Sequence, residues 1–231
     1  MIPRELLGIT DVPGGPPLTL YRRGGDYMIT LERNELMSSR MSGSEVALGV
    51  MACQRIGQRP ATRILIGGYG MGFTLRAVLA EVGDDAEVVV AELVPMIIDW
   101  ARGPMAEMTA GCLDDPRVDL RMADVAAVIE ASGSGYDAIL LDVDNGPDGL
   151  TRDDNNRLYN GRGLAAVRNA LRPGGVLGIW SAAADAVFSK RLSSAGFAVN
   201  EVRVRARENG KGPHHLLWFA TPHYRLGTDI I

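Results

Sequence analysis

Residues 63–92 read RILIGGYGMGFTLRAVLAEVGDDAEVVVAE, and the order of patterns within them decides the fold class. The apolar run RILIG is followed by a glycine-rich segment, then by a segment with helical spacing, and finally by a second apolar run, EVVVAE. Short runs that are apolar on both faces and alternate with helices are typical of a parallel sheet covered on both sides. The stretch therefore predicts an α/β fold.

The same alternation continues towards the C-terminus. Three more strands are predicted, RVDLR (117–121), YDAILLDV (136–143) and GVLGIW (175–180). Helices are expected at about 73–82, 94–103, 124–132, 154–171 and 184–195. The last two runs, FAVNEVRVRAR and HHLLWFATPHY, are separated only by the polar turn ENGKGP and predict an antiparallel hairpin. The expected result is a seven-stranded, mostly parallel sheet with an antiparallel C-terminal hairpin, as in class I methyltransferase-like folds.

The first 58 residues predict a small attachment to this sheet. Residues 1–16 are rich in Pro and Gly and are expected to form an arm or loop. The run LTLYRRGGDYMITLER predicts one β-hairpin, and a helix capped by Ser42 or Ser44 is expected to reach about Ile56. We therefore expect an N-terminal arm, hairpin and helix over 1–58, and the α/β domain over 59–231.

Composition excludes several classes of protein. The 231 residues carry a net charge of -4, which disfavours a general nucleic-acid binder or a protein attracted to an anionic membrane. The N-terminus lacks the pattern of a signal peptide, and no apolar run is long enough to span a membrane, so a soluble cytoplasmic protein is expected. The two cysteines have no metal-binding spacing, so neither a disulfide scaffold nor a zinc site is expected.

A candidate nucleoside site follows the first three strands of the predicted parallel sheet. Gly68, Gly70 and Gly72 form a G-x-G-x-G loop, where the backbone can turn sharply and approach a ligand. Glu92 ends the second strand and is placed to accept hydrogen bonds from ribose hydroxyls. Asp124 follows the third strand, where it could accept from an adenine amine, cap a helix, or do both.

The glycine loop differs from the two common phosphate-binding loops. The third glycine of a dinucleotide fingerprint would fall at Phe73, and no Lys-Ser/Thr pair follows as in a P-loop. An NAD-dependent oxidoreductase is therefore disfavoured. The pattern indicates a nucleoside without a pyrophosphate, such as S-adenosylmethionine or a relative.

A cluster of polar residues follows the fourth strand. Asp142 ends the strand, and Asp144 and Asn145 lie in the loop beyond it. An amine has a pKa of about 10 and must lose a proton before it can attack a sulfonium carbon, and a carboxylate within hydrogen-bonding distance can accept that proton. We expect Asp142 and Asp144 to serve this catalytic role. Turn formation and metal binding are alternatives, although no His lies nearby in the sequence.

In these segments and their order, the sequence resembles the spermidine synthase (polyamine aminopropyltransferase) family. The carrying segments are GGYGMGFTLRAVL, VVVAELVPMIIDWAR, DDPRVDLRMADV, YDAILLDVDNGP and LYNGRGLAAVRNALRPGGVLGIW, which occur in the family's order over roughly residues 60 to 180. The resemblance implies a Rossmann-like methyltransferase fold, use of decarboxylated S-adenosylmethionine, and an oligomer, here expected to be a homodimer. It implies that Glu92 holds the ribose, Asp124 the adenine, and that Asp142 activates the acceptor amine.

The sequence departs from the family at the acceptor side. The family's loop acid that contacts the charged end of the aminopropyl chain is Met71 here, and its Tyr-His-Glu is Gly43-Ser44-Glu45. Residues expected to contact the acceptor are Glu45, Asn145 and Tyr159. The pair His214-His215 lies on the predicted last hairpin, where adjacent side chains point to opposite faces of the sheet and cannot easily share a ligand.

The function indicated by these patterns is transfer of an aminopropyl or methyl group to an amine-type acceptor, and the family resemblance points to a polyamine. The donor would be S-adenosylmethionine or its decarboxylated form, used as a co-substrate without a metal. Two alternatives stay open: a methyltransferase acting on another small molecule, and a catalytically silent nucleoside-binding dimerisation module. In the silent module, Tyr69, Met71 or Tyr159 would fill the space beside Asp142.

Overall fold

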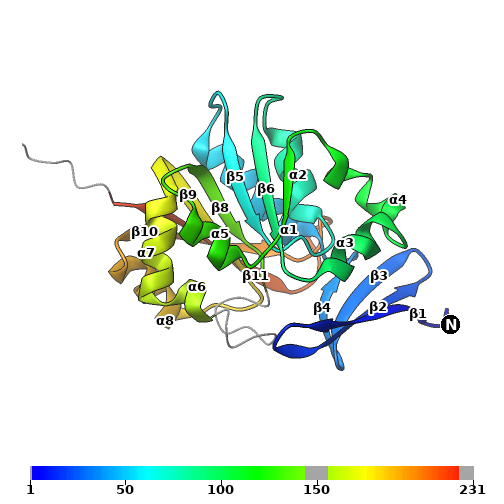
Figure 1. Ribbon diagram of the computed structural model, residues 1–231. Helices are drawn as coiled ribbons and strands as arrows, with labels where there is room; N and C mark the ends of the chain where they lie inside the picture. The colour runs from blue at the N-terminus through cyan, green and yellow to red at the C-terminus, as the bar shows by residue number, and fades with distance from the viewer. Residues whose placement is uncertain (1, 144–155, 224–231) are drawn as a thin grey trace, which may run out of the picture.

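The computed structural model describes residues 2–143 and 156–223, which form two β-sheets and the helices around them (Figure 1). The larger sheet has seven strands in the order β10-β11-β9-β8-β5-β6-β7. Its strands are β5 (Arg63–Gly67), β6 (Glu87–Glu92), β7 (Val118–Met122), β8 (Tyr136–Leu141), β9 (Leu171–Ser181), β10 (Phe197–Arg205) and β11 (His214–Pro222). Strands β5 to β9 pair in parallel, and β11 pairs antiparallel with both β9 and β10. The predicted seven-stranded sheet with its antiparallel hairpin is confirmed.

Helices cover both faces of this sheet. They are α1 (Gly43–Ile56), α2 (Phe73–Glu81), α3 (Pro95–Arg102), α4 (Ala106–Thr109), η1 (Cys112–Asp114), α5 (Val125–Ala131), α6 (Asn156–Tyr159), α7 (Gly161–Ala170) and α8 (Ala186–Ser194). Ile64 and Ile66 of β5 pack into the apolar cluster that includes α1, α2 and α3, whereas Leu65 between them packs into the cluster with α5, α7 and α8. A strand apolar on both faces therefore separates two cores, as RILIG predicts.

The sequence predicts one helix over 154–171, but the described part of that range contains two helices. Helix α6 ends at Tyr159, and α7 begins at Gly161. The side chain of Asn160 between them accepts hydrogen bonds from the backbone N–H groups of Arg162 and Gly163, at 2.9 and 3.0 Å. An N-cap of this kind begins a new helix because it satisfies N–H groups that have no partner inside the helix.

The N-terminal region differs from the expected arm and single hairpin. It forms a four-stranded antiparallel sheet of β1 (Glu5–Val12), β2 (Gly15–Arg23), β3 (Asp26–Leu31) and β4 (Asn34–Ser38). The Pro- and Gly-rich segment expected to be a loop is a tight turn between β1 and β2, in which Gly14 has a φ of 73°. The expectation of an arm or loop over residues 1–16 was therefore wrong for residues 5–12, because this turn allows them to pair with β2.

The N-terminal sheet packs against the same core as the larger sheet. Leu20, Ile29 and Leu31 belong to the apolar cluster that contains Ile97 and Ile98 of α3. Figure 1 shows the sheet lying beneath α3, next to the carboxyl ends of β5 and β6. The N-terminal strands thus form one wall of the space beyond these ends.

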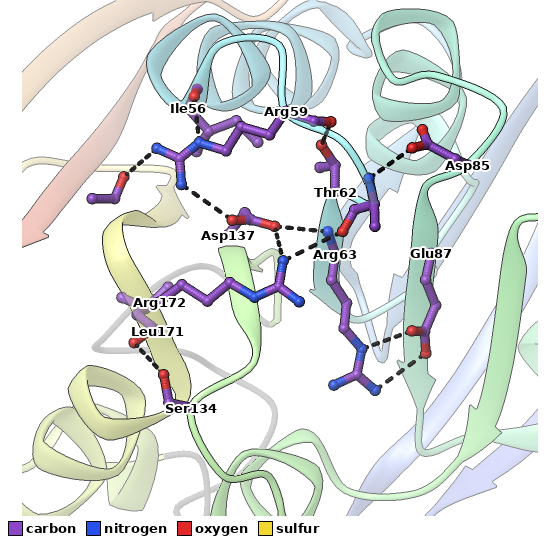
Figure 2. Close-up of polar contacts among 12 residues, drawn as sticks. Ile56, Arg59, Thr62, Arg63, Asp85, Glu87, Ser134, Asp137, Leu171 and Arg172 are labelled. Atoms are coloured by element: carbon purple, nitrogen blue, oxygen red, sulfur yellow. Dashed lines mark hydrogen bonds and ion pairs between the residues drawn. The ribbon is translucent and has the colours of Figure 1, made fainter.

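The opposite end of the larger sheet is held by ion pairs around Asp137 (Figure 2). This carboxylate is 2% exposed and pairs with Arg59 at 3.1 Å and Arg172 at 2.7 Å. It also accepts a hydrogen bond from the backbone N–H of Arg63 at 2.9 Å, and the Arg63 guanidinium pairs with Glu87. Since a buried carboxylate is costly without such partners, these contacts fix β5, β8 and β9 relative to one another at their shared amino-terminal edge.

Candidate active site

A cavity of about 160 Å³ lies at the carboxyl ends of the parallel strands. Ligands of open α/β sheets bind at this edge. One wall is the N-terminal sheet, which contributes the apolar side chains Val12, Leu18, Ile29, Leu36 and Met37. Four carboxylates also line the cavity, Glu45, Glu92, Asp124 and Asp142. No Lys, Arg or His is among its described lining residues, so the described surface suits a cationic ligand.

The glycine loop follows β5 and borders this cavity. Gly68, Gly70 and Gly72 have φ angles of 85°, 55° and 74°, in the left-handed region that favours glycine. A Cβ at Gly68 would lie 2.6 Å from the backbone carbonyl oxygen of Asp142. Gly68 and Gly70 line the cavity, whereas Gly72 sits behind them at the start of α2. The loop therefore needs glycine both for its backbone angles and for its close approach to β8.

Glu92 connects the glycine loop to the end of β6. Its buried carboxylate accepts a hydrogen bond from the backbone N–H of Tyr69 at 2.9 Å and one from Val94 at 2.8 Å. Burial raises the pKa of this carboxyl, and the backbone N–H groups around it partly oppose that shift. Glu92 thus fixes the loop and presents an acceptor group to the cavity, as a ribose would require.

Asp124 caps a helix and also lines the cavity. Its Oδ1 accepts a hydrogen bond from the backbone N–H of Ala126 at 2.8 Å, which makes it the N-cap of α5. Its Oδ2 forms an ion pair with Arg157 of α6. The residue also lines the cavity, so capping the helix does not remove it from the candidate nucleoside site.

Asp142 follows β8, lies beside the glycine loop and lines the cavity. The hydroxyl of Thr74 in α2 donates a hydrogen bond to its Oδ2 at 3.2 Å. Burial raises the pKa of Asp142 to about 6, and the Thr74 hydrogen bond opposes this shift. At neutral pH the carboxyl is therefore mostly ionised but has a proton affinity well above that of an ordinary aspartate, which suits a general base.

Glu45 brings a second acid to the cavity from α1. Burial and the negative charge of Asp142 raise its pKa to about 8, while a hydrogen bond from the hydroxyl of Ser44 opposes the shift. Asp142 and Glu45 titrate as a coupled pair that holds about one proton near neutral pH. The arrangement offers an acceptor amine one ionised and one protonated carboxyl group.

The structure brings together most of the described residues predicted for the site, but not all of them. Tyr159 does not line the cavity. Its buried ring packs edge-on against Phe188, with the ring centroids 5.5 Å apart, in the core on the α7 and α8 side of the sheet. Asp144 and Asn145 lie outside the described residues.

Several lining residues were not expected from the sequence. The apolar wall comes from β1 to β4, where the alternation in LTL and MITL signals a buried face but not what that face covers. Trp180, at the end of β9, also lines the cavity. No local pattern could assign these side chains to a site, because the segments meet only in the folded chain.

The space beside Asp142 is open in the described structure. Tyr69 and Met71 are both buried in the core and do not line the cavity. The Tyr69 hydroxyl lies 3.5 Å from the sulfur of Cys112, and Met71 is 0% exposed. The feature expected of a silent module, a pocket filled by these side chains, is thus absent from the described residues.

Two further observations apply to residues 2–143 and 156–223. No group of three or more His, Cys, Asp or Glu side chains in these ranges is arranged to hold a metal ion. No helix within them is long and apolar enough to cross a membrane.

The geometry agrees with what comparison with known proteins shows. The family model described as the spermine/spermidine synthase domain matches residues 49–228. The chain belongs to the spermine/spermidine synthase family. The resemblance in the segments around Gly68, Glu92 and Asp142 is thereby confirmed at the level of the family.

Relatives within the spermine/spermidine synthase family include two kinds of transferase. The polyamine aminopropyltransferase of Mycobacterium tuberculosis is 30% identical over 153 residues, which cover 62% of this chain and 28% of that protein. Putrescine N-methyltransferase 4 of Nicotiana tabacum is 30% identical over 166 residues, which cover 71% of this chain and 39% of that protein. The matched stretches cover less than half the length of these relatives.

A solved structure of the spermine/spermidine synthase family has the same fold. The spermidine synthase from Thermotoga maritima superposes with a TM-score of 0.73 at 18% sequence identity, and the match covers 95% of this chain and 74% of that one. The coverage includes the N-terminal sheet, since 95% of this chain cannot be reached without it.

Proposed function

We propose that this chain is a transferase that moves an aminopropyl or methyl group from a sulfonium nucleoside to an amine-type acceptor. The observation that carries the proposal is the coupled acid pair Asp142 and Glu45, which lies in the same cavity as the glycine loop and Glu92. The donor would be S-adenosylmethionine or its decarboxylated form, used as a co-substrate.

The nucleoside half of the proposed site is formed by residues after β5, β6 and β7. Glu92 would accept hydrogen bonds from the ribose hydroxyls, and Asp124 would accept one from the adenine amine. Gly68 and Gly70 would let the nucleoside approach the backbone, because no Cβ stands in the way. The donor supplies an electrophilic carbon bonded to positively charged sulfur, and these residues would hold it in place.

The acceptor half is formed by the acid pair. Asp142 would accept the proton that an ammonium group must lose before the amine nitrogen can attack the sulfonium carbon. Positioning the nitrogen in line with the breaking carbon–sulfur bond contributes further to the rate. Asp144 and Asn145, which lie outside the described residues, are proposed to assist Asp142.

Two features bear on which group is transferred. Met71 stands where the family's loop has an acid for the aminopropyl chain, which favours methyl transfer. The described lining holds four acidic side chains, of which Glu45 is protonated at neutral pH, and no cationic side chain, which disfavours the α-carboxylate of the intact methyl donor. We give the second feature more weight, because it reflects the whole described lining rather than one position.

Calorimetric titration with the two donors tests this assignment. We expect decarboxylated S-adenosylmethionine to bind about 10-fold more tightly than the intact form, since it lacks the carboxylate that the acidic cavity repels. Methylthioadenosine, which has neither charged end, serves as the control for the nucleoside half. Tighter binding of intact S-adenosylmethionine would instead favour the methyltransferase, and no binding of any of the three would contradict the proposed nucleoside site.

A Glu92→Ala variant tests the nucleoside half separately. Loss of a charge-assisted acceptor should weaken methylthioadenosine binding by about 10- to 100-fold, measured as Kd by calorimetry. Glu87→Ala is the matched control, because Glu87 begins the same strand and pairs with Arg63 at the opposite edge of the sheet. Equal affinity in the Glu92 and Glu87 variants would show that Glu92 does not hold the nucleoside.

The family resemblance also leads us to propose a cytoplasmic homodimer that acts on a polyamine. Leu6 and Ile9 on the edge strand β1 are 53% and 58% exposed, which supports a protein interface along that strand. The excess of carboxylates in the cavity supports a cationic acceptor.

A further inference from the structure

The hydroxyl of Ser44 is surrounded by three polar partners. Ser44 is 0% exposed, and its Oγ accepts a hydrogen bond from the indole Nε1 of Trp180 at 2.9 Å. The same Oγ lies 2.6 Å from Oε2 of Glu45 and 2.8 Å from Nδ1 of His215. Glu45 lines the cavity, whereas His215 is half-buried at the start of β11.

These three contacts use the full hydrogen-bonding capacity of the hydroxyl. A serine hydroxyl has one proton to donate and two lone pairs, and the indole N–H of Trp180 can only donate, so it takes one lone pair. One proton and one lone pair therefore face Glu45 and His215. If Glu45 is protonated, it donates to Ser44, and Ser44 donates to a bare Nδ1. If Glu45 is ionised, Ser44 donates to Glu45, and Nδ1 must carry a proton.

We propose that Ser44 shares one proton between Glu45 and His215, and that this relay carries the proton released by the acceptor amine out of the cavity. The origin of that proton rests on the proposed function. The sharing itself depends only on the contacts of Ser44 and is independent of any reaction.

The proton balance of amine alkylation calls for such a route. An acceptor ammonium loses one proton, its nitrogen forms a bond to carbon, and the carbon–sulfur bond breaks to leave a neutral thioether. The nitrogen of the secondary ammonium product carries one proton fewer than the nitrogen of the acceptor ammonium. One proton therefore leaves per turnover. Asp142 takes that proton, and Glu45 passes its own proton through Ser44 to Nδ1 of His215, which releases one from Nε2. The acid pair still holds one proton, which returns from Asp142 to Glu45 before the next cycle.

The charges around the relay favour this direction. Ionised Asp142 is one of the two causes that raise the pKa of Glu45, so neutralising Asp142 lowers the proton affinity of Glu45. Burial lowers the pKa of His215, which keeps its ring neutral and able to accept at neutral pH. The turn between β10 and β11 lies over the start of α1 and brings Arg207 and Glu208 near, with Glu208 accepting from the hydroxyl of Ser42 at 3.0 Å. Trp180 from β9 and Thr74 from α2 add no charge.

Nitrogen NMR of the histidine rings tests the sharing without any substrate. As the pH rises through about 8, where Glu45 ionises, we expect His215 to change from the Nε2–H to the Nδ1–H tautomer. The change should disappear in Ser44→Ala, which removes the shared hydroxyl, and in Glu45→Gln, which cannot ionise. A His215 tautomer that stays fixed between about pH 6 and pH 9 in the unmodified protein would overturn the proposal.

Turnover measurements test the proton transfer. In Ser44→Ala and His215→Ala, kcat should fall by about 10-fold with KM unchanged, and added imidazole should restore His215→Ala alone. His214→Ala is the control, because this neighbour is exposed and should leave kcat unchanged. An unchanged kcat in both relay variants would overturn the transfer step. If the tautomer change is present but no donor and amine react, the sharing stands and the proposed function fails.

Discussion

Asp142→Asn should lower the turnover of amine alkylation by about 100- to 10,000-fold and leave the affinity for methylthioadenosine unchanged. The asparagine has nearly the same shape and keeps an oxygen for the Thr74 hydroxyl, but it cannot accept a proton from the acceptor. The measurement is single-turnover kinetics beside calorimetry of the nucleoside. Turnover that survived intact would contradict the role of Asp142 as general base.

The pH dependence of the same enzyme provides an independent check. Because Asp142 has a pKa of about 6, kcat of the unmodified protein should rise as the pH increases through about 6. Glu45→Gln should retain this rise, since Glu45 is still protonated in that range. A rise displaced to about pH 4, the value of an ordinary aspartate, would show that Asp142 is not the titrating group.

Stability should change in the opposite direction from activity. The folded-state pKa of Asp142 lies above its unfolded value of 3.8, so its ionisation costs stability at any pH above that value. Asp142→Asn removes this cost, and the ligand-free variant should gain about 1–3 kcal/mol of unfolding free energy at pH 8. The gain should vanish below about pH 4, where the carboxyl is protonated in both states. Urea unfolding at both pH values measures the difference.

Gly68→Ala should destabilise the protein by about 2–4 kcal/mol and also reduce turnover. The residue has a φ of 85°, which an alanine adopts only with strain. In addition, the new Cβ would lie 2.6 Å from the carbonyl oxygen of Asp142, so the backbone that carries the general base must move. Denaturant unfolding gives the loss of stability, and kcat reports the displacement.

Gly111→Ala is the matched control for this substitution. Gly111 has a φ of 67°, and a Cβ there would meet nothing within 4 Å. Its replacement therefore carries the backbone strain alone, about 1–2 kcal/mol, with turnover unchanged. Equal losses of stability at the two glycines would mean that the contact between the loop and β8 contributes nothing.

The larger sheet could be predicted from the sequence because each parallel strand lies between two apolar cores. Ile64, Leu65 and Ile66 pack alternately on the two faces, so the whole run is apolar and stands out from the helices around it. Strand β1 gives no such signal, since Leu6 and Ile9 remain exposed on an edge strand. Its pairing depends on the turn at Gly14, which the sequence shows only as a segment rich in Pro and Gly.

The sequence predicts those site residues that stand at the carboxyl ends of the parallel strands. Glu92 and Asp142 end parallel strands, and such ends gather at one edge of a sheet. Tyr159 could not be assigned in this way, because the direction of its side chain depends on how α6 packs against Phe188. The contact between Ser44 and His215 joins residues 171 positions apart and has no local pattern at all.

The N-terminal sheet has a consequence for how the specificity of such a protein can evolve. Strands β1 to β4 contribute Val12, Leu18, Ile29, Leu36 and Met37 to the cavity, but no carboxylate and no part of the glycine loop. Exchanges among apolar residues at these positions would alter the width of the cavity, while the acidic side chains stay on α1 and at the strand ends of the larger sheet. Selectivity for the shape of the acceptor and the chemistry of the transfer can therefore change independently within one chain.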